Sequence, residues 1–294
     1  MPEKTFPPLK LRLILNPRSG RAARALPAVR AFAARHGATV VLTERPRHAT
    51  ALAKSALDDG CDVIAAIGGD GTMNEVASAL VGTPATLGLV PCGSGDGLGR
   101  HLRIHGSPER ALEILLTGRP RLIDTGLADG HPFFTAAGLG FEAEIARRFN
   151  ALARRGFARY LTTAFAAWRE WEPEEFAITT AAGRTSLRAF TLAVANAAQY
   201  GNNAFIAPAA TLDDGRLNLC ALPRVTVWNG APLALRLFRG TIDRASGVIS
   251  HSAPHFLVER AAPGPLHTDG ELHHAGARVE FAVRPASLRV MAPA

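Results

Sequence analysis

The chain has 294 residues, 47% of them hydrophobic and 20% charged, which is an ordinary globular composition with room for two domains. Met1 to Pro8 lacks an apolar core and no run of about 18 apolar residues occurs, so we expect neither a signal peptide nor a membrane span. Three widely spaced cysteines argue against a disulfide framework and favour a reducing cytoplasm. The net charge of +8 favours an anionic partner, such as a nucleotide, a membrane surface or a nucleic acid.

The first 120 residues alternate between apolar runs of strand length and helical periodicity. The predicted order is a strand at 9–15, a helix ending at His36 with Gly37 as its cap, a strand at 39–42, a helix at 49–59, a strand at 61–67, a helix from about 73, a strand at 86–90 and a helix at 108–117. This alternation predicts a parallel, doubly wound α/β sheet.

Three of these strands end in loops of small and polar residues, at 16–20, 68–72 and 91–97. In doubly wound sheets ligands bind beyond the carboxyl ends of the strands. Three such loops at one edge of the sheet therefore predict a ligand site there.

The loop Gly68-Gly69-Asp70-Gly71-Thr72 follows a buried strand and opens a helix. Glycines allow a ligand to approach the backbone closely, and a helix N-terminus attracts phosphate. A carboxylate beside a phosphate makes sense if Asp70 holds Mg²⁺ or orients a hydroxyl, although a strand–helix turn with an Asp cap is the simpler alternative. The loop Gly93-Ser94-Gly95-Asp96-Gly97 is a second candidate, either as an anion nest or as a flexible loop before a helix.

The pattern changes near residue 120. Strands are predicted at 121–127 and 133–137 with a hairpin turn at 128–131, helices at 141–150 and 160–171, and further strands at 176–180, 187–195, 216–222, 247–252, 256–258, 278–283 and 288–291. These short runs predict a mainly antiparallel β-sandwich or flattened barrel. We place the first domain at 1–122 and the second at 123–283, and we expect a cleft between them because no long linker occurs.

Four stretches of the second half are candidates for chemistry. Gly138–Ala143 is a loose dinucleotide turn, Asn196–Asn203 is rich in amides, and Asp213 and Asp214 lie on a turn that suits a hard cation or a plain hairpin. Asp269-Gly270-Glu271 places two carboxylates on one face if the strand is regular, which suits proton abstraction from a hydroxyl. Histidines at 267, 273 and 274 leave a metal site as the alternative.

Arginines between 147 and 159 interleave with apolar and aromatic residues up to Trp171. Basic and aromatic residues side by side on a helix suit a membrane interface. A core helix with a solvated basic face is the alternative.

Gly68–Thr72 with Glu75, the Asn16…Ser19-Gly20 turn, the loop at 93–97 and Asp269-Gly270-Glu271 occur in an order that resembles the diacylglycerol kinase catalytic family. This family includes bacterial soluble lipid kinases and sphingosine kinases, and the resemblance covers nearly the whole chain. The first glycine loop alone also resembles those of NAD kinases and phosphofructokinases, and the later loops favour the lipid kinases.

The resemblance implies an α/β domain, a C-terminal β-sandwich, ATP in the cleft between them, and a last segment, 284–294, that returns to the first domain. Asp70 would lie near Mg²⁺, and Asp269 or Glu271 would supply the base for the lipid hydroxyl. A second, structural metal would be bound by Asp214 and by backbone oxygens of Thr211 and Arg216. The nucleotide-binding residues implied are Asn16, Ser19, Gly20, Thr43, Gly68, Gly69, Asp70, Gly71, Thr72, Glu75, Gly93, Ser94 and Gly95.

One departure from the family pattern affects the acceptor: Asp96 stands where the family often has Asn, and Gly97 where it often has Asp. The sequence predicts a cytoplasmic, peripherally membrane-associated lipid kinase that uses ATP and Mg²⁺, and leaves a homodimer open. The alternatives are an NAD kinase-like enzyme with a soluble acceptor and a lipid- or nucleotide-binding regulator without turnover. A nucleic-acid partner is not predicted, because no recognition motif supports it.

Overall fold

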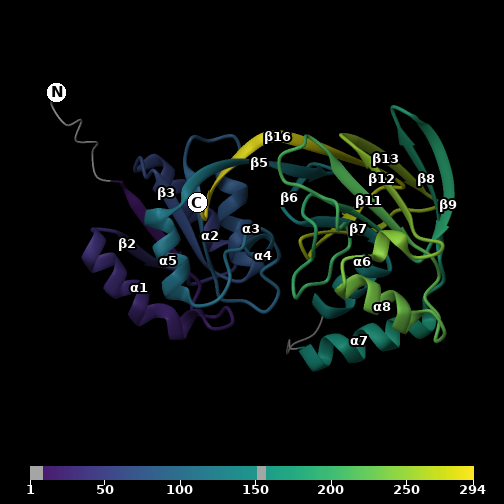
Figure 1. Cartoon of the computed structure of the whole chain (residues 1–294), viewed down its shortest axis with the longest axis horizontal. Helices are drawn as coiled ribbons and strands as arrows, with labels where there is room; N and C mark the ends of the chain where they lie inside the picture. The colour runs from purple at the N-terminus through teal and green to yellow at the C-terminus, as the bar shows by residue number, and fades with distance from the viewer. Residues whose placement is uncertain (1–8, 151–156) are drawn as a thin grey trace. The chain divides into compact units, whose positions relative to one another are not determined.

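The computed structural model describes residues 9–150 and 157–294, which form two compact units (Figure 1). Unit 1 comprises Met1–Ile123 together with Ser287–Ala294, and unit 2 comprises Asp124–Ala286. Two strands pass from one unit to the other, β5 (Arg119–Ala128) and β16 (Arg278–Ala292).

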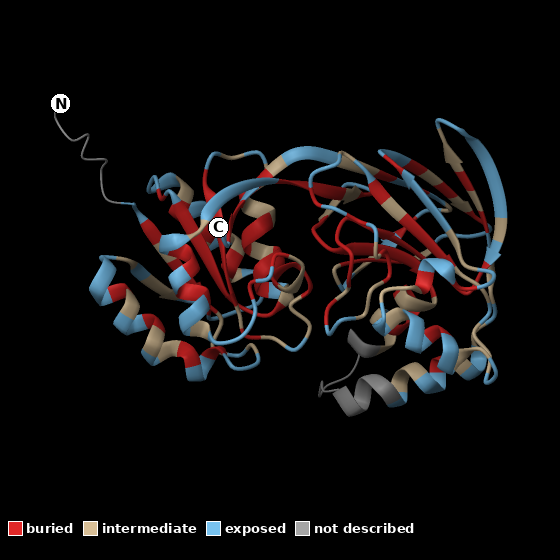
Figure 2. Ribbon diagram, in the orientation of Figure 1, coloured by how far each residue is buried: buried red, intermediate tan, exposed pale blue. Residues whose placement is uncertain are grey.

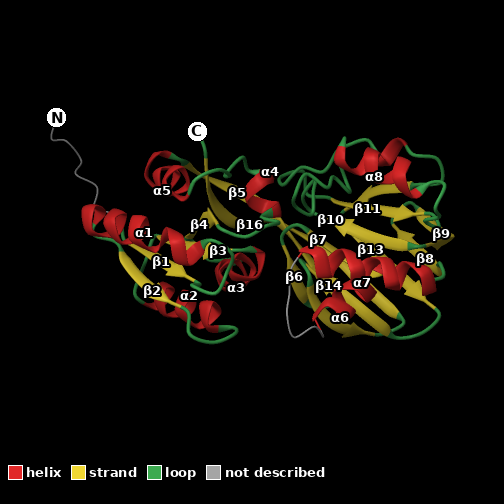
Figure 3. Cartoon of the chain, turned by 90° about the horizontal axis from the view of Figure 1, so that it is seen from below, coloured by secondary structure: helices red, strands yellow, loops and turns green. Residues whose placement is uncertain are grey.

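Unit 1 is a parallel sheet in the order β2-β1-β3-β4, with the end of β16 paired in parallel to β4. Helix α1 contacts α5 and helix α2 contacts α3, so one pair covers each face of the sheet (Figure 3). The predicted doubly wound α/β domain is confirmed. Its elements are β1 (Leu11–Leu15), α1 (Ala22–His36), β2 (Thr39–Leu42), α2 (His48–Asp58), β3 (Val63–Gly68), α3 (Asp70–Leu80), β4 (Thr86–Pro91), α4 (Gly97–His101) and α5 (Pro108–Thr117).

Local signals account for most boundaries in unit 1. All six residues of β3 are buried, as expected for a central strand covered by helices on both faces (Figure 2). Helix α1 ends at Gly37, whose φ of 65° is the left-handed cap conformation. Helix α5 begins after Ser107, whose side chain accepts a hydrogen bond from the Arg110 backbone N–H. The short helix α4 is not predicted by the sequence pattern.

Unit 2 is a sandwich of two antiparallel sheets, which confirms the second predicted fold class. One sheet has the order β12-β11-β10-β7-β14-β15, and the other contains β16, β13, β8 and β9. Buried phenylalanines at 133, 176, 256 and 281 lie in the core to which both sheets contribute. The elements are β6 (His131–Phe133), β7 (Ala136–Gly140), α6 (Phe141–Asn150), α7 (Phe157–Glu170), β8 (Glu174–Thr180), β9 (Gly183–Ala189), β10 (Thr191–Ala195), β11 (Leu217–Leu222), α8 (Gly230–Phe238), the 3₁₀ turn Ile242–Arg244, β12 (Ile249–Ala253), β13 (His255–Arg260), β14 (Gly264–Thr268) and β15 (Glu271–Ala275).

Several expectations for unit 2 need correction. The run at 187–195 is two strands, β9 and β10, which belong to different sheets. The runs at 278–283 and 288–291 are one long strand, β16. Strands β14 and β15 are not predicted, because they contain few apolar residues. Helix α8 is not predicted either. The hairpin at 128–131 is correct, since Ala128 pairs with His131 across a tight turn.

No helix in the described part of the chain is both long and apolar enough to cross a membrane.

Candidate functional site

The loops that follow β1, β3 and β4 meet at the carboxyl edge of the unit 1 sheet. The strand order reverses between β1 and β3, and doubly wound sheets bind ligands at such a reversal. The Gly69 N–H donates to Ser19 Oγ over 2.7 Å, and the Asn16 amide donates to the Thr72 hydroxyl over 3.1 Å. The structure therefore brings the first two predicted loops together.

The third loop packs against the first two so closely that glycine is needed. Gly20 has a φ of 51°, and a Cβ there would overlap the Cys92 carbonyl oxygen. A Cβ on Gly93 would lie 2.8 Å from Gly69 Cα. The Arg21 N–H also donates to the Cys92 carbonyl over 2.9 Å. Contacts between loops thus require these glycines even before any ligand binds.

Asp70 is the first residue of α3, and its carboxylate joins the second loop to the third. Its two oxygens accept the backbone N–H groups of Asp96 and Gly97, each over 3.0 Å. A Cβ on Gly95 would lie 2.7 Å from one of these oxygens. Asp70 therefore holds the third loop against the start of α3.

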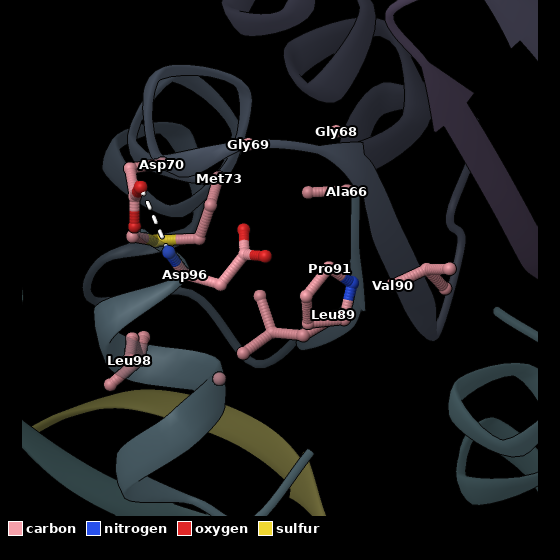
Figure 4. Close-up of a pocket in the computed structure, with 11 residues that line it drawn as sticks. Ala66, Gly68, Gly69, Asp70, Met73, Leu89, Val90, Pro91, Asp96 and Leu98 are labelled. Atoms are coloured by element: carbon pink, nitrogen blue, oxygen red, sulfur yellow. Dashed lines mark hydrogen bonds between the residues drawn. The ribbon is translucent and has the colours of Figure 1, made fainter. Parts of the chain in front are cut away.

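A small pocket lies beside Asp70, and the carboxylate of Asp96 also points into it (Figure 4). The left-handed backbone of Asp96, with a φ of 51°, suits Asp or Asn. Burial, together with the nearby charge of Asp70, raises the pKa of Asp96 from 3.8 to about 6. The cavity is about 20 Å³, enough for roughly one water molecule. Two carboxylates therefore face a cavity whose other walls are mainly apolar.

Of the remaining residues predicted to bind nucleotide, Gly68, Gly71 and Ser94 lie at or just after the ends of β3 and β4, whereas Thr43 lies after β2. Gly68 lies against the Thr72 side chain, Gly71 has open space around its Cα, and Ser94 is exposed at the edge of its loop. Thr43 is buried after β2, where its N–H donates to the Leu15 carbonyl.

Glu75 has a structural role in this arrangement. Its carboxylate accepts the N–H groups of Arg47 over 3.2 Å and Ala49 over 2.9 Å, at the start of α2. The N-cap residue of α2, Arg47, makes no capping hydrogen bond with its side chain. The Glu75 carboxylate therefore caps the helix in its place. Nucleotide binding by Glu75 stays a prediction.

Asp269 lies in the tight turn between β14 and β15, not in a regular strand. The φ angles of Asp269 and Gly270 are 50° and 83°, so the expectation that Asp269 and Glu271 share a strand face is wrong. The Asp269 carboxylate accepts the N–H groups of Phe134, Thr135 and Ala136 over 2.8–3.0 Å, and also the Thr135 hydroxyl. Four donors occupy the usual acceptor positions of this carboxylate.

Glu271 begins β15 and is exposed. One of the nearby histidines is held by other contacts: His273 stacks on His131 with 3.8 Å between ring centroids, and its Nε2 lies 2.7 Å from the Thr268 hydroxyl. Within residues 9–150 and 157–294 no group of three or more His, Cys, Asp or Glu side chains is arranged to hold a metal ion. The histidine metal alternative therefore has no support in this geometry.

The turn predicted as a structural metal site is anchored by a residue that the sequence pattern did not single out, Asp124. One Asp124 oxygen accepts the Gly215 N–H over 2.7 Å and the other accepts the Ala286 N–H over 2.8 Å. Asp214 accepts the N–H of Arg216, as in an Asx turn. Thr211 is exposed. Metal binding by Thr211, Asp214 and Arg216 stays a prediction.

The amide-rich stretch begins with a structural residue. Asn196 is fully buried and donates to the carbonyls of Asp124 and Phe134 over 2.9 and 3.1 Å. It thus supports the backbone beside both Asp124 and the segment that binds Asp269.

The loose dinucleotide turn at 138–143 does not form a βαβ unit, because β7 pairs antiparallel with both of its neighbours. Glu142 fills the space that a Cβ on Gly138 would need. The Tyr200 hydroxyl donates to one oxygen of Glu142, and His267 Nε2 lies 3.5 Å from the other. The dinucleotide interpretation is therefore wrong, and Gly138 makes room for a buried carboxylate.

Comparison with known proteins gives two family matches that together cover most of the chain. Residues 10–128 match the diacylglycerol kinase catalytic domain, and residues 135–292 match the YegS C-terminal NAD kinase beta sandwich-like domain. A protein of Chromohalobacter salexigens named "Probable lipid kinase YegS-like" is 30% identical, over 96% of this chain and 92% of its own length.

Solved structures show the same fold at low identity. A diacylglycerol kinase structure from Bacillus anthracis aligns with a TM-score of 0.73 and 17% identity, covering 97% of both chains. An NAD kinase from Archaeoglobus fulgidus in complex with ATP aligns with a TM-score of 0.55 and 12% identity, covering 96% of this chain and 93% of its own. At such identities the likeness concerns the fold.

Proposed function

The chain belongs to the diacylglycerol kinase catalytic-domain family, and from this premise we propose that it transfers a phosphoryl group from ATP to a hydroxyl of a membrane lipid. The observation that carries the proposal is the set of three loops in unit 1, held together by the Ser19–Gly69 and Asp70–Asp96 hydrogen bonds. Phosphoryl transfer depends mainly on positioning and charge neutralisation; the loops would supply the positioning, and an ion held by their carboxylates would supply the neutralisation.

Unit 1 supplies the nucleotide site in this proposal. Backbone N–H groups at the start of α3 and at residues 94 and 95 would bind the phosphates, as helix N-termini and glycine loops do. The Gly93 N–H donates to the Asp96 carboxylate over 3.2 Å, so a phosphate contact there would require this hydrogen bond to break. Asn16 and Thr72 are already tied to each other by a hydrogen bond of 3.1 Å, so their polar groups are preordered at the same edge. Such preorganisation lowers the entropy lost when a nucleotide binds.

The donor set suits Mg²⁺. The carboxylates of Asp70 and Asp96 face one pocket, and Mg²⁺ prefers one or two carboxylates together with phosphate oxygens. Asp70 and Asp96 would hold the ion, which when bound would offset negative charge on the phosphates.

Unit 2 supplies the proton acceptor. Asp269 uses its acceptor positions on residues 134–136, whereas Glu271 is exposed at the start of β15. We therefore assign proton acceptance to Glu271 and a positioning role to Asp269. Glu271 can accept the proton only if the hydroxyl of the lipid acceptor comes within hydrogen-bond distance of its carboxylate.

Incubation of the purified protein with labelled ATP, Mg²⁺ and a total lipid extract in mixed micelles tests the proposal. A labelled lipid in the organic phase, absent with Asp70→Asn, supports it. Label that appears on NAD without any lipid would instead support the NAD kinase-like alternative, which the fold also permits. ATP binding without product from either acceptor would support a regulator.

A further inference from the structure

Exposed apolar side chains gather on one surface of unit 2. Nine large apolar side chains are well exposed in the described part of the chain, and five of them belong to helix α7, the loop 223–229 and helix α8. We call these three segments the α7–α8 surface. Its exposed apolar side chains are Phe165, Val227, Trp228, Leu235 and Phe238.

Helix α8 is apolar on two opposite faces. Leu233 packs inward in a small core with Ile242 and Ala245. The outward face carries Ala231, Ala234, Leu235 and Phe238, at spacings i, i+3, i+4 and i+7, and all four are exposed. The outward stripe of a surface helix in a globular domain is normally polar, so this face suits a non-aqueous neighbour.

The loop before α8 holds Val227 and Trp228 outward in a fixed turn. The side chain of Asn229 accepts the Thr226 N–H over 2.7 Å and donates to the Arg224 carbonyl over 2.9 Å. These two hydrogen bonds join Asn229, which follows Val227 and Trp228, to residues that precede them, and so close the turn. Trp228 is 88% exposed and Val227 is 70% exposed. The turn thus presents two apolar side chains without needing to reorganise.

A groove of about 330 Å³ lies between α7 and this loop. Trp168 and Trp171 line it together with Arg169 and Arg224. The Trp168 indole N–H donates to the Val225 carbonyl over 2.8 Å, which fixes the ring against the loop. Indole and guanidinium groups side by side are typical of the boundary between lipid headgroups and acyl chains.

The charges around this surface are positive. Glu170 and Glu172 are paired with Arg148 and Arg224. Arg169, Arg236 and Arg239 are exposed and form no ion pair with any residue that the structure describes. This positive fringe complements an anionic surface. It opposes a two-fold contact with a second copy, in which the same arginines would face one another.

We propose that the α7–α8 surface docks on an anionic phospholipid bilayer, with Val227, Trp228 and Phe238 entering the interface and arginines 169, 236 and 239 contacting the headgroups. This inference deepens the proposed function and rests on its lipid acceptor. It shares Phe165, Trp168 and Trp171 with the predicted membrane segment at 147–171 but uses other basic residues. Arg148 is paired with Glu144 and Glu170, and Arg154 and Arg155 lie outside the described residues.

Sedimentation with vesicles, without ATP, tests the docking directly. The full-length protein should bind vesicles of phosphatidylglycerol and phosphatidylcholine more tightly than vesicles of phosphatidylcholine alone, and added salt should weaken the binding. The double variant Val227→Ser/Trp228→Ser should bind at least tenfold more weakly. The control is Leu116→Ser, since Leu116 is an exposed apolar residue on α5 in unit 1, and this variant should bind as the wild type does.

A second pair of variants separates charge from apolar insertion. Arg236→Gln/Arg239→Gln should remove most of the preference for phosphatidylglycerol and leave weak binding to phosphatidylcholine vesicles. The fluorescence of Trp228 is obtained by subtracting the emission spectrum of Trp228→Phe from that of the wild type. Its emission maximum should shift to shorter wavelength when vesicles are added. An unshifted difference spectrum would show that Trp228 does not enter the bilayer.

The outcomes distinguish this inference from the proposed function. Unchanged vesicle binding by the folded double variant would overturn the docking surface. Loss of dimer mass in sedimentation equilibrium for that variant, with vesicle binding intact, would assign the surface to a second copy instead. Phosphorylation of a short-chain lipid kept below its micelle concentration does not require docking, so it should persist in the double variant. Vesicle binding by a protein that phosphorylates no lipid would support docking and contradict the proposed function.

Discussion

At the scale of single residues, Asp96 makes the pocket of unit 1 sensitive to pH. Its pKa is raised to about 6 by burial and by the charge of Asp70, against about 3.9 in an unfolded chain. The folded protein therefore holds this proton more tightly than the unfolded one. The contribution of Asp96 to the free energy of unfolding is full below about pH 4 and is lost as the pH rises through about 6.

Replacement of Asp96 by Asn should consequently stabilise the protein at pH 8. We expect a gain of about 1–2 kcal/mol, allowing for solvent screening, and a smaller difference at pH 4.5. Urea unfolding of wild type and Asp96→Asn at both pH values, with a chelator to remove divalent cations, measures this difference. A gain of equal size at both pH values would show that the charge of Asp96 is not its cause.

The two carboxylates of the β14–β15 turn should respond differently to amide substitution. Glu271→Gln should lower kcat by about 10²–10⁴-fold and leave the free energy of unfolding nearly unchanged, because Glu271 is exposed. Asp269→Asn places an N–H₂ group against backbone donors at 134–136, which should cost about 1.5–3 kcal/mol of stability as well as activity. Parallel kinetics and urea titrations separate the two effects. Full activity in Glu271→Gln would transfer proton acceptance to Asp269.

At the scale of elements, Glu75 couples helix α3 to the start of α2. Glu75→Ala removes the acceptor for the N–H groups of Arg47 and Ala49, and it removes a negative charge from a helix N-terminus. We expect a loss of about 1–2 kcal/mol in the free energy of unfolding, with ATP affinity nearly unchanged. Calorimetric ATP titration beside thermal unfolding checks both values. A loss of ATP affinity in a variant of unchanged stability would restore the predicted nucleotide contact.

The parts of the fold that the sequence predicts are those whose signals are local. The buried strand β3, the glycine turn and helix α3 lie within one short stretch, and the cap of α1 is a single glycine. The contacts of Asp269 reach residues more than 130 positions away, and no periodicity records such a pairing. The face that Asp269 presents therefore could not be predicted from the spacing of Asp269 and Glu271.

The same reason explains Asp96 and Asp124. Asp96 stands out in the sequence as a departure from a family pattern, but its contact with Asp70 depends on two loops that meet only in the folded sheet. Asp124 lies in a predicted strand and belongs to no motif, and its role is visible only when β5, the turn at 215 and β16 are brought together.

At the scale of the whole molecule, the two units are joined by a strand that both of them need. The last residues of β16 pair with β4, and Leu288 and Val290 are fully buried in unit 1. The sheet of unit 1 therefore needs residues 287–292, although its strands β1 to β4 lie in the first hundred residues. Val279 is equally buried in unit 2 on the same strand.

This arrangement allows a matched test with one substitution at two positions. Val290→Ala and Val279→Ala each remove two methyl groups from a buried site and should each cost roughly 2 kcal/mol. Native-state hydrogen exchange should show Val290→Ala weakening protection mainly in β3 and β4, and Val279→Ala weakening it mainly in β8 and β13. Because the nucleotide loops follow β3 and β4, only Val290→Ala should also reduce the thermal stabilisation by ATP with Mg²⁺. Equal loss of protection in both units from either variant would show that the chain unfolds as one cooperative body, joined through β5 and β16.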